Sequence, residues 1–192
     1  LRVVCGLSYE VRGLKNLPDG PAIVASKHQS AFDTVVFTRF LPDAAYVLKK
    51  ELLAVPCFGW YLRRCRMIPV DRSGGSRALK EMIAVARQAA AEGRAILIFP
   101  EGTRTRPGDS RPYHPGVAAL YKALHLPTVP VALNSGLYWP RRSFIKRPGR
   151  IVVELLPAIP PGLERQDFMA RLREAIEDTS MRLNDDPSEN ID

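Results

Sequence analysis

Short apolar runs alternate with helix-like segments along almost the whole chain, and this alternation restricts the possible folds more than any other feature. The apolar, strand-like runs are residues 7–14, 21–25, 44–48, 67–70, 95–99, 128–133 and 150–156. The segments with a helical pattern are residues 31–40, 50–64, 77–92, 116–125 and 165–183, of which Pro56 and Gly59 interrupt the second. Strands that alternate with helices favour an α/β fold, in which helices cover both faces of one sheet.

The length of the chain sets the number of domains. A chain of 192 residues can form one domain with a substantial core, but it is too short for two. We therefore expect a single α/β domain over residues 1–185, with a mostly parallel or mixed β-sheet flanked by helices on both faces, and a polar C-terminal tail at residues 186–192. Ligands bind such sheets beyond the carboxyl ends of the strands. His28 and Glu101 each follow an expected strand at such a position.

The net charge of +8 suits an anionic partner, such as a nucleic acid, a membrane surface, an acidic substrate or an acidic carrier protein. The arginines are spread along the sequence without a nucleic-acid-binding motif, which argues against a nucleic-acid-binding protein. The three cysteines lack the spacing of metal ligands, so we expect free thiols in a reducing compartment and no bound metal.

No run reaches the roughly 18 apolar residues that a membrane-spanning helix requires, and no signal peptide is recognisable. The sequence begins at Leu1 instead of a methionine. We therefore expect a piece of a longer protein from which an N-terminal anchor is missing.

His28 follows the apolar run 21–25 and precedes a helical segment for which Ser30 is the expected N-cap. An imidazole can take the proton of an alcohol because its pKa lies near neutrality. A carboxylate bonded to the other ring nitrogen would fix the tautomer and stabilise the imidazolium. The sequence therefore predicts His28 as a general base with Asp33 as its partner. Because the pattern Gly-x-Ser-x-Gly is absent, direct attack by a substrate hydroxyl is favoured over a covalent acyl-enzyme.

The spacing of His28 and Asp33 requires a bend in the chain. Five extended residues would separate them by roughly 16 Å, and one continuous helix would point the two side chains apart. A junction between loop and helix at Ser30 would let Asp33 curl back under His28. In the alternative interpretation, Asp33 only supports the helix start through a capping pattern with Ser30.

Residues 99–104 (Phe-Pro-Glu-Gly-Thr-Arg) form a candidate phosphate-binding loop. Gly102 permits a close approach of the backbone, Thr103 offers a hydroxyl, and Arg104 carries donors that match phosphate oxygens. Glu101 would either orient Arg104 or bind a substrate hydroxyl. The alternative is a surface turn with exchangeable charges.

Arg72 is a second phosphate candidate, because it follows the apolar run 67–70 and Asp71 in a similar position. The alternative for Arg72 is an ion pair with Asp71 at the surface.

Taken together, these segments resemble the 1-acylglycerol-3-phosphate acyltransferase (lysophosphatidate acyltransferase) family over about residues 8 to 160. The four motifs of that family are similar to His28–Asp33, residues 59–72, residues 99–104 and residues 129–131. Four motifs in the right order strengthen the catalytic interpretation of His28 and Asp33. Two positions depart from the family pattern: Arg66 stands where a glycine is frequent, and His114 stands where a lysine is common.

The resemblance implies an enzyme that transfers a fatty acyl group from acyl-CoA or acyl carrier protein to the 2-hydroxyl of 1-acylglycerol 3-phosphate. The product would be phosphatidic acid, a precursor in phospholipid biosynthesis. His28 and Asp33 would be catalytic, and Arg72 and the segment Glu101, Gly102, Thr103 and Arg104 would bind substrate. No cofactor is implied beyond the acyl thioester, which is a co-substrate.

The expected partners are the two substrates, with acyl carrier protein as a further candidate, and an anionic membrane surface. The resemblance places the enzyme at the cytoplasmic side of a membrane, either peripheral or anchored by a segment absent from this chain. Two rival functions stay open: an acyltransferase for another lysophospholipid or a lyso-aminolipid, and a non-catalytic module that binds anionic lipids.

Overall fold

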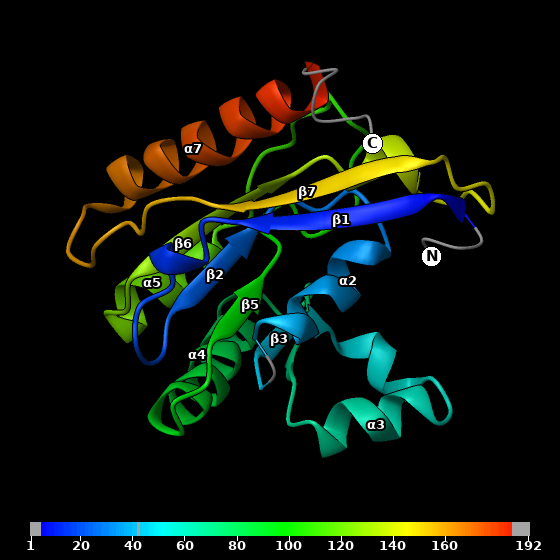
Figure 1. Cartoon of the computed structure of the whole chain (residues 1–192). Helices are drawn as coiled ribbons and strands as arrows, with labels where there is room; N and C mark the ends of the chain where they lie inside the picture. Colours follow the sequence, from blue (N-terminus) through cyan, green and yellow to red (C-terminus); the bar gives the residue numbers. More distant parts are fainter. Residues whose placement is uncertain (1–4, 42, 186–192) are drawn as a thin grey trace.

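The computed structural model describes residues 5–41 and 43–185, and these residues form one sheet with helices on both of its faces (Figure 1). The strands are β1 (Leu7–Arg12), β2 (Ile23–Ser26), β3 (Ala45–Lys49), β4 (Ile68–Val70), β5 (Ile96–Ile98), β6 (Thr128–Leu133) and β7 (Gly149–Leu155). The α-helices are α2 (Phe32–Val36), α3 (Phe58–Arg64), α4 (Gly75–Ala91), α5 (Gly116–Leu124), α6 (Ser135–Tyr138) and α7 (Arg165–Asp185). Short 3-10 helices are η1 (Leu14–Asn16), η2 (Phe37–Arg39) and η3 (Lys50–Ala54).

The strands lie in the order β1-β7-β6-β2-β5-β3-β4. All neighbours run parallel except β6 and β7, which are antiparallel, so β1 and β7 run opposite to the other five. As a result, the carboxyl ends of β2, β4, β5 and β6 meet the amino end of β7 at one edge of the sheet. We call this edge the carboxyl edge.

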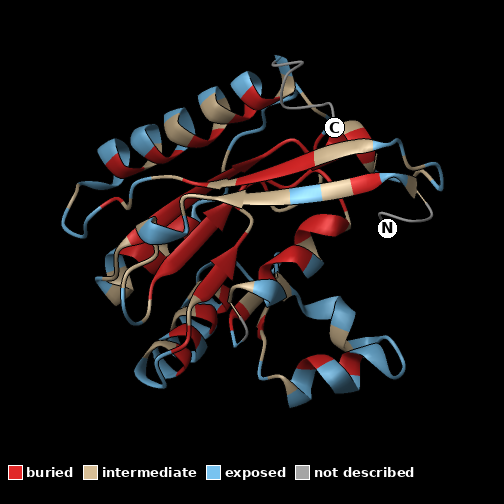
Figure 2. Ribbon diagram, in the orientation of Figure 1, coloured by how far each residue is buried: buried red, intermediate tan, exposed pale blue. Residues whose placement is uncertain are grey.

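Two hydrophobic clusters fill the space on the two sides of the sheet. One cluster joins the strands to α4, α5 and α7, and the other joins them to α2 and η2. Strand β2 shows why both sides are apolar: Ile23 and Ala25 belong to the first cluster and Val24 to the second. Figure 2 shows the buried residues concentrated in the strands and on the inward sides of the helices. A strand buried on both faces reads as a continuous apolar run, because alternate side chains contact different helix layers.

These observations confirm the expected fold class, a single mixed sheet covered on both faces. The helix expected over residues 50–64 divides instead into η3 and α3, because the chain turns at Pro56 and Cys57, whose φ is 60°. The expected polar tail, residues 186–192, lies outside the described residues. No helix among residues 5–41 and 43–185 combines the length and the apolar character needed to cross a bilayer.

Candidate active site

His28 and Asp33 are in direct contact at the carboxyl edge. The chain leaves β2 at Ser26, crosses a short loop and begins α2 at Phe32, and this bend brings the Nδ1 atom of His28 to 3.0 Å from Oδ2 of Asp33. The bend lies one residue later than expected, since Ala31 and not Ser30 occupies the cap position of α2.

The carboxylate of Asp33 is fully buried and accepts hydrogen bonds on both oxygens. Oδ2 accepts the backbone N–H groups of Gln29 (2.7 Å) and Ser30 (2.8 Å), and Oδ1 accepts the hydroxyl of Ser135, which follows β6 (2.5 Å). Asp33 therefore satisfies both interpretations of the sequence: it contacts the imidazole, and it binds backbone N–H groups just before the helix. These bonds fix the carboxylate and, through it, the ring of His28.

The ring of His28 stacks on Phe99, the residue after β5, with 4.0 Å between the ring centroids. The side chain is 11% exposed. Since Nδ1 faces Asp33, the nitrogen Nε2 is left for another partner, and no hydrogen bond in the described part of the chain involves it. A neutral imidazole that donates through Nδ1 has an unprotonated Nε2, which is the atom a general base requires.

Arg72 lies over the turn that contains Gly102. A Cβ atom on Gly102 would stand 3.4 Å from the guanidinium carbon of Arg72 and 2.6 Å from Cδ2 of His114, and the φ of Gly102 is +65°. The left-handed backbone angle therefore favours glycine, and an added methyl group would also have to displace the side chain of His114. The ion pair of Arg72 with Asp71 that the sequence left open does not occur among the described residues, where Asp71 contacts Ser73 and Lys50 instead.

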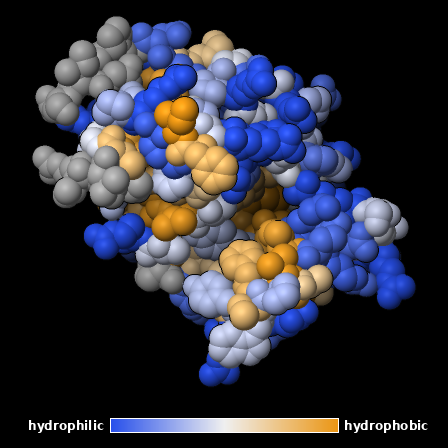
Figure 3. Space-filling model, turned by 90° about the vertical axis from the view of Figure 1, so that its right-hand side faces the viewer, coloured by the Kyte–Doolittle hydropathy of each residue, from blue (hydrophilic) through white to orange (hydrophobic). Residues whose placement is uncertain are grey.

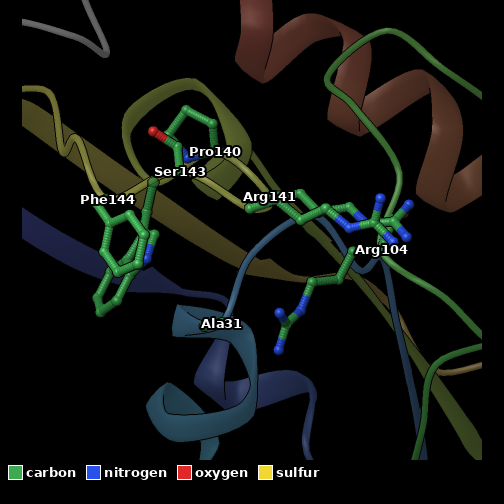
Figure 4. Close-up of a pocket in the computed structure, with 8 residues that line it drawn as sticks. Ala31, Arg104, Pro140, Arg141, Ser143 and Phe144 are labelled. Carbon is green, nitrogen blue, oxygen red and sulfur yellow. The ribbon is translucent and has the colours of Figure 1, made fainter.

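Arg104 and Thr103 are half-buried, and no hydrogen bond or ion pair of the described residues involves either side chain. Figure 4 shows the guanidinium of Arg104 extending toward the start of α2, where Ala31 is labelled. Ala31, Arg104 and the segment 139–144 line a hollow of about 380 Å³. The carboxyl edge thus carries two arginines, Arg104 beside Ala31 and Arg72 over the turn at Gly102.

Glu101 does not contact Arg104. Its Oε1 accepts from the ammonium of Lys27 (2.8 Å) and the hydroxyl of Thr105 (3.1 Å), and its Oε2 accepts the backbone N–H of His28 (3.1 Å). Burial raises the pKa of Glu101, and the nearby Lys27 opposes that effect. The backbone N–H of Thr105 also donates to the carbonyl of His28 (2.8 Å), so the loop after β5 holds both backbone groups of His28. The expected contact of Glu101 with a substrate hydroxyl stays a prediction.

Known proteins with similar sequences identify the family. The family model described as "Acyltransferase" matches residues 8–134. The chain belongs to the acyltransferase family.

Two curated members of this family illustrate the similarity. A 1-acyl-sn-glycerol-3-phosphate acyltransferase from Pseudomonas aeruginosa is 41% identical over 92% of this chain and 68% of its own length. The human 1-acyl-sn-glycerol-3-phosphate acyltransferase beta is 30% identical over 96% of this chain and 69% of its own length. The sequence motifs and the names of these relatives therefore indicate the same family.

The fold is also that of a solved structure. The crystal structure of the 1-acyl-sn-glycerophosphate acyltransferase PlsC from Thermotoga maritima superposes with a TM-score of 0.77 at 23% identity. The alignment covers 93% of this chain and 73% of the other. This similarity confirms the acyltransferase fold.

The two departures from the family pattern have different surroundings. Arg66 has a φ of 51°, a left-handed conformation that glycine adopts most easily. Its guanidinium pairs with Glu92 at 2.6 Å near the surface. His114 lies against the turn at Gly102, beside Arg72. Of the two, only His114 is next to the candidate phosphate-binding residues.

Lys27 is a buried residue of the site that sequence reasoning missed. Its ammonium is held by four oxygen atoms: Oε1 of Glu101, both carboxylate oxygens of Glu177 on α7 (2.8 and 3.0 Å) and the carbonyl of Asp109 (3.0 Å). Tyr113 donates its hydroxyl to Glu177 (2.8 Å), and burial raises the pKa of Tyr113. The residue before His28 therefore joins the loop of His28 to the last helix.

The partners of this network were not detectable in the sequence. Ser135 and Glu177 are separated from Asp33 and Lys27 by 102 and 150 residues, and neither belongs to a recognisable motif. Glu177 also lies beyond the residues that the family model matches. The available signal was weak: Lys27 adjoins the candidate base and follows a fully apolar strand, and a lysine at such a position needs an acidic partner.

Proposed function

We propose that the chain transfers a fatty acyl group from an acyl thioester to the 2-hydroxyl of 1-acylglycerol 3-phosphate and so forms phosphatidic acid. The contact between His28 and the buried carboxylate of Asp33 carries the proposal, because it lies at the same edge as Arg72, which covers the turn at Gly102. Family membership supports this choice of reaction, since the relatives are named for this acyl transfer.

The proposed reaction begins with the removal of a proton. Nε2 of His28 takes the proton of the 2-hydroxyl as the oxygen attacks the thioester carbonyl, and Asp33 stabilises the imidazolium. The carbon–sulfur bond then breaks, and the imidazolium returns the proton to the departing thiolate. The products are phosphatidic acid and a free thiol, with no acyl-enzyme intermediate. The donor is acyl-CoA or acyl carrier protein.

The phosphate of the acceptor is assigned to Arg72 and Arg104, with the backbone at Gly102 and the hydroxyl of Thr103. Guanidinium groups bind phosphate oxygens through charge-assisted hydrogen bonds. Among residues 5–41 and 43–185 no hydrogen bond or ion pair occupies the side chain of Arg104 or Thr103, which favours this role. We further place the reaction at the cytoplasmic surface of a membrane, where the acceptor and product reside.

The test is the release of thiol from acyl-CoA, measured with and without added 1-acylglycerol 3-phosphate. We expect release to depend on the acceptor in the wild-type protein. His28→Asn should lower kcat by about 10²- to 10⁴-fold, because general base catalysis contributes that much. The matched control is His125→Asn, since His125 is exposed at the end of α5 and has the left-handed φ of 51° that asparagine tolerates.

Two results would contradict the proposal. One is a His28→Asn protein that turns over as fast as His125→Asn. The other is binding of the lipid without any release of thiol, which would identify a lipid-binding module. A panel of acceptors with and without the phosphate tests the substrate, since acceptors that lack it should react with a much higher KM.

A further inference from the structure

The segment that joins α6 to β7 carries an apolar tip between positive charges. Its sequence, residues 139–148, reads Trp-Pro-Arg-Arg-Ser-Phe-Ile-Lys-Arg-Pro and contains no acidic residue. Phe144 is fully exposed at 102%, and the next residue, Ile145, is 73% exposed. Two adjacent large apolar side chains in water lose the favourable burial that such residues normally have. We call residues 139–148 the basic loop.

Local bonds hold the tip of the basic loop in this shape. The hydroxyl of Ser143 accepts the backbone N–H of Ile145 (3.1 Å). The ammonium of Lys146 donates to the carbonyls of Ser143 (3.1 Å) and Phe144 (3.2 Å) and lies 4.6 Å from the ring centroid of Trp139. These hydrogen bonds hold the turn in the conformation that exposes Phe144 and Ile145 to solvent.

The base of the basic loop is tied to the candidate site. The backbone N–H of Arg147 donates to the carbonyl of Tyr138 (2.8 Å), which closes the loop. The guanidinium of Arg141 donates to the carbonyl of Arg104 (2.9 Å). Phe144, Arg104 and Ala31 line the same hollow, and Figure 4 shows Arg104 extending toward the start of α2, where Ala31 is labelled. The basic loop therefore borders the hollow beside the candidate phosphate-binding arginine.

Helix α3 presents a second apolar surface of the same kind. Phe58, Trp60 and Tyr61 are exposed, Trp60 at 68%, and Arg63 and Arg64 follow them in the last turn. Helix α3 and the segment that enters β7 lie on the right-hand side of Figure 1, which Figure 3 turns toward the viewer. In Figure 3, hydrophobic patches lie above and below a hollow that is itself partly hydrophobic.

The chemistry of this face fits a lipid bilayer better than a protein. Stable protein interfaces have a closely packed apolar core inside a polar rim, whereas here the exposed apolar side chains lie at the tip of a turn and on a short helix, among arginines and lysines. Aromatic residues favour the boundary between headgroups and acyl chains. Adjacent arginines and lysines complement anionic headgroups, and each contributes to binding near such a surface.

We propose that the basic loop and α3 dock this protein on an anionic lipid bilayer, with Phe144 and Ile145 inserted between the headgroups. The docking proposal rests on the proposed function in one respect. If the acceptor is a lipid, the hollow beside Arg104 has to face a membrane to receive it. Docking places that hollow next to the bilayer, so that a lysolipid can enter without crossing water.

The test compares binding to vesicles that contain phosphatidylglycerol and phosphatidylcholine with binding to pure phosphatidylcholine vesicles, by co-sedimentation. We expect the wild-type protein to bind the anionic vesicles preferentially. Phe144→Ser combined with Ile145→Ser should weaken that binding roughly ten- to a hundredfold, because two inserted side chains are lost. The matched control is Val85→Ser with Met181→Ser, since these exposed apolar residues lie on α4 and α7. Thermal unfolding verifies that both double variants fold.

Turnover separates this proposal from the proposed function. Ile145 does not line the hollow, so Ile145→Ser should retain turnover of a short-chain acceptor dissolved as monomers and lose turnover of an acceptor carried in vesicles. Unchanged vesicle binding by the Phe144 and Ile145 double variant would overturn the docking proposal, and so would wild-type protein that ignores anionic vesicles. If the double variant bound vesicles normally and lost turnover only when the donor is acyl carrier protein, the basic loop would be assigned to binding that acidic protein instead. Vesicle binding without any turnover would contradict only the proposed function.

Discussion

Lys27 is only 2% exposed, and its ammonium is surrounded by oxygen atoms from three different parts of the chain. A buried ammonium loses its hydration, and only close, well-oriented acceptors compensate for that loss. Glu101, Glu177 and the carbonyl of Asp109 are those acceptors. Because Glu101 also binds the backbone of His28, the position of the imidazole depends on a charge that lies outside the proposed reaction.

Lys27→Met should therefore lower the free energy of unfolding by about 3–5 kcal/mol, because it leaves buried carboxylates without a cation. Chemical denaturation measures the change. Lys122→Met, at an exposed position on α5, should alter stability by no more than about 0.5 kcal/mol. The double variant Lys27→Met with Glu177→Gln should lose less free energy of unfolding than the sum of the two single variants, because the second change removes one of the carboxylates left without a cation. Equal stability of the Lys27 and Lys122 variants would refute this account.

At the scale of single residues, the sequence predicted the contacts that are local. The candidate base and Asp33 were recognisable because a bend after a strand brings residues five apart together. Glu101 was recognised as part of a motif, but its partners were not, since they depend on how loops after β2 and β5 meet. Glu177 could not be predicted, because nothing in an amphipathic helix identifies which acidic residue faces a distant lysine.

Among the elements, η3 and α3 show how one close approach determines a helix boundary. A Cβ atom on Gly59 would stand 2.1 Å from the carbonyl oxygen of Leu53, so η3 packs directly against the backbone of α3. The sequence indicated an interruption at Pro56 and Gly59. It did not reveal that Gly59 packs against the backbone of η3 instead of making the chain flexible.

Gly59→Ala should destabilise the protein by about 1–3 kcal/mol, because the added methyl group forces η3 and α3 apart. Gly116→Ala is the matched control in the first turn of α5, where the new Cβ would meet Met82 at an ordinary 3.6 Å. Helix propensity predicts that this control is neutral or more stable by up to about 1 kcal/mol. Thermal melts of both variants decide the matter, and a Gly59→Ala protein as stable as the Gly116→Ala protein would contradict the close contact.

Across the whole molecule, one reversal in the sheet assembles the site. The connection from β6 to β7 contains the four-residue helix α6, and β7 returns antiparallel to β6. The reversal puts the basic loop at the carboxyl edge beside the loops after β2 and β5. Alternating apolar runs predicted the two helix layers, but strand order depends on which strands meet in space, and periodicity does not encode that.

The net charge of +8 makes binding to anionic vesicles sensitive to salt. The Debye length falls from about 10 Å at 0.1 M to about 3 Å at 1 M, so attraction between surface arginines and headgroups weakens over this range. We expect vesicle binding to fall roughly tenfold or more, because several cations contribute. Turnover of a monomeric acceptor serves as the control, and the same increase in salt should change it less than it changes vesicle binding. Salt-independent binding would mean that apolar insertion alone holds the protein.

The bond between Lys27 and Glu177 also has a consequence for synthesis on the ribosome. The two residues are 150 positions apart, so the loop that carries the imidazole emerges long before its last anchor. Chains generally fold from the amino terminus as they are made. A nascent chain that has already formed β2 and β5 can pair the lysine with Glu101 but still lacks Glu177, and the complete set of contacts around the lysine forms only once the final helix has been translated and has docked.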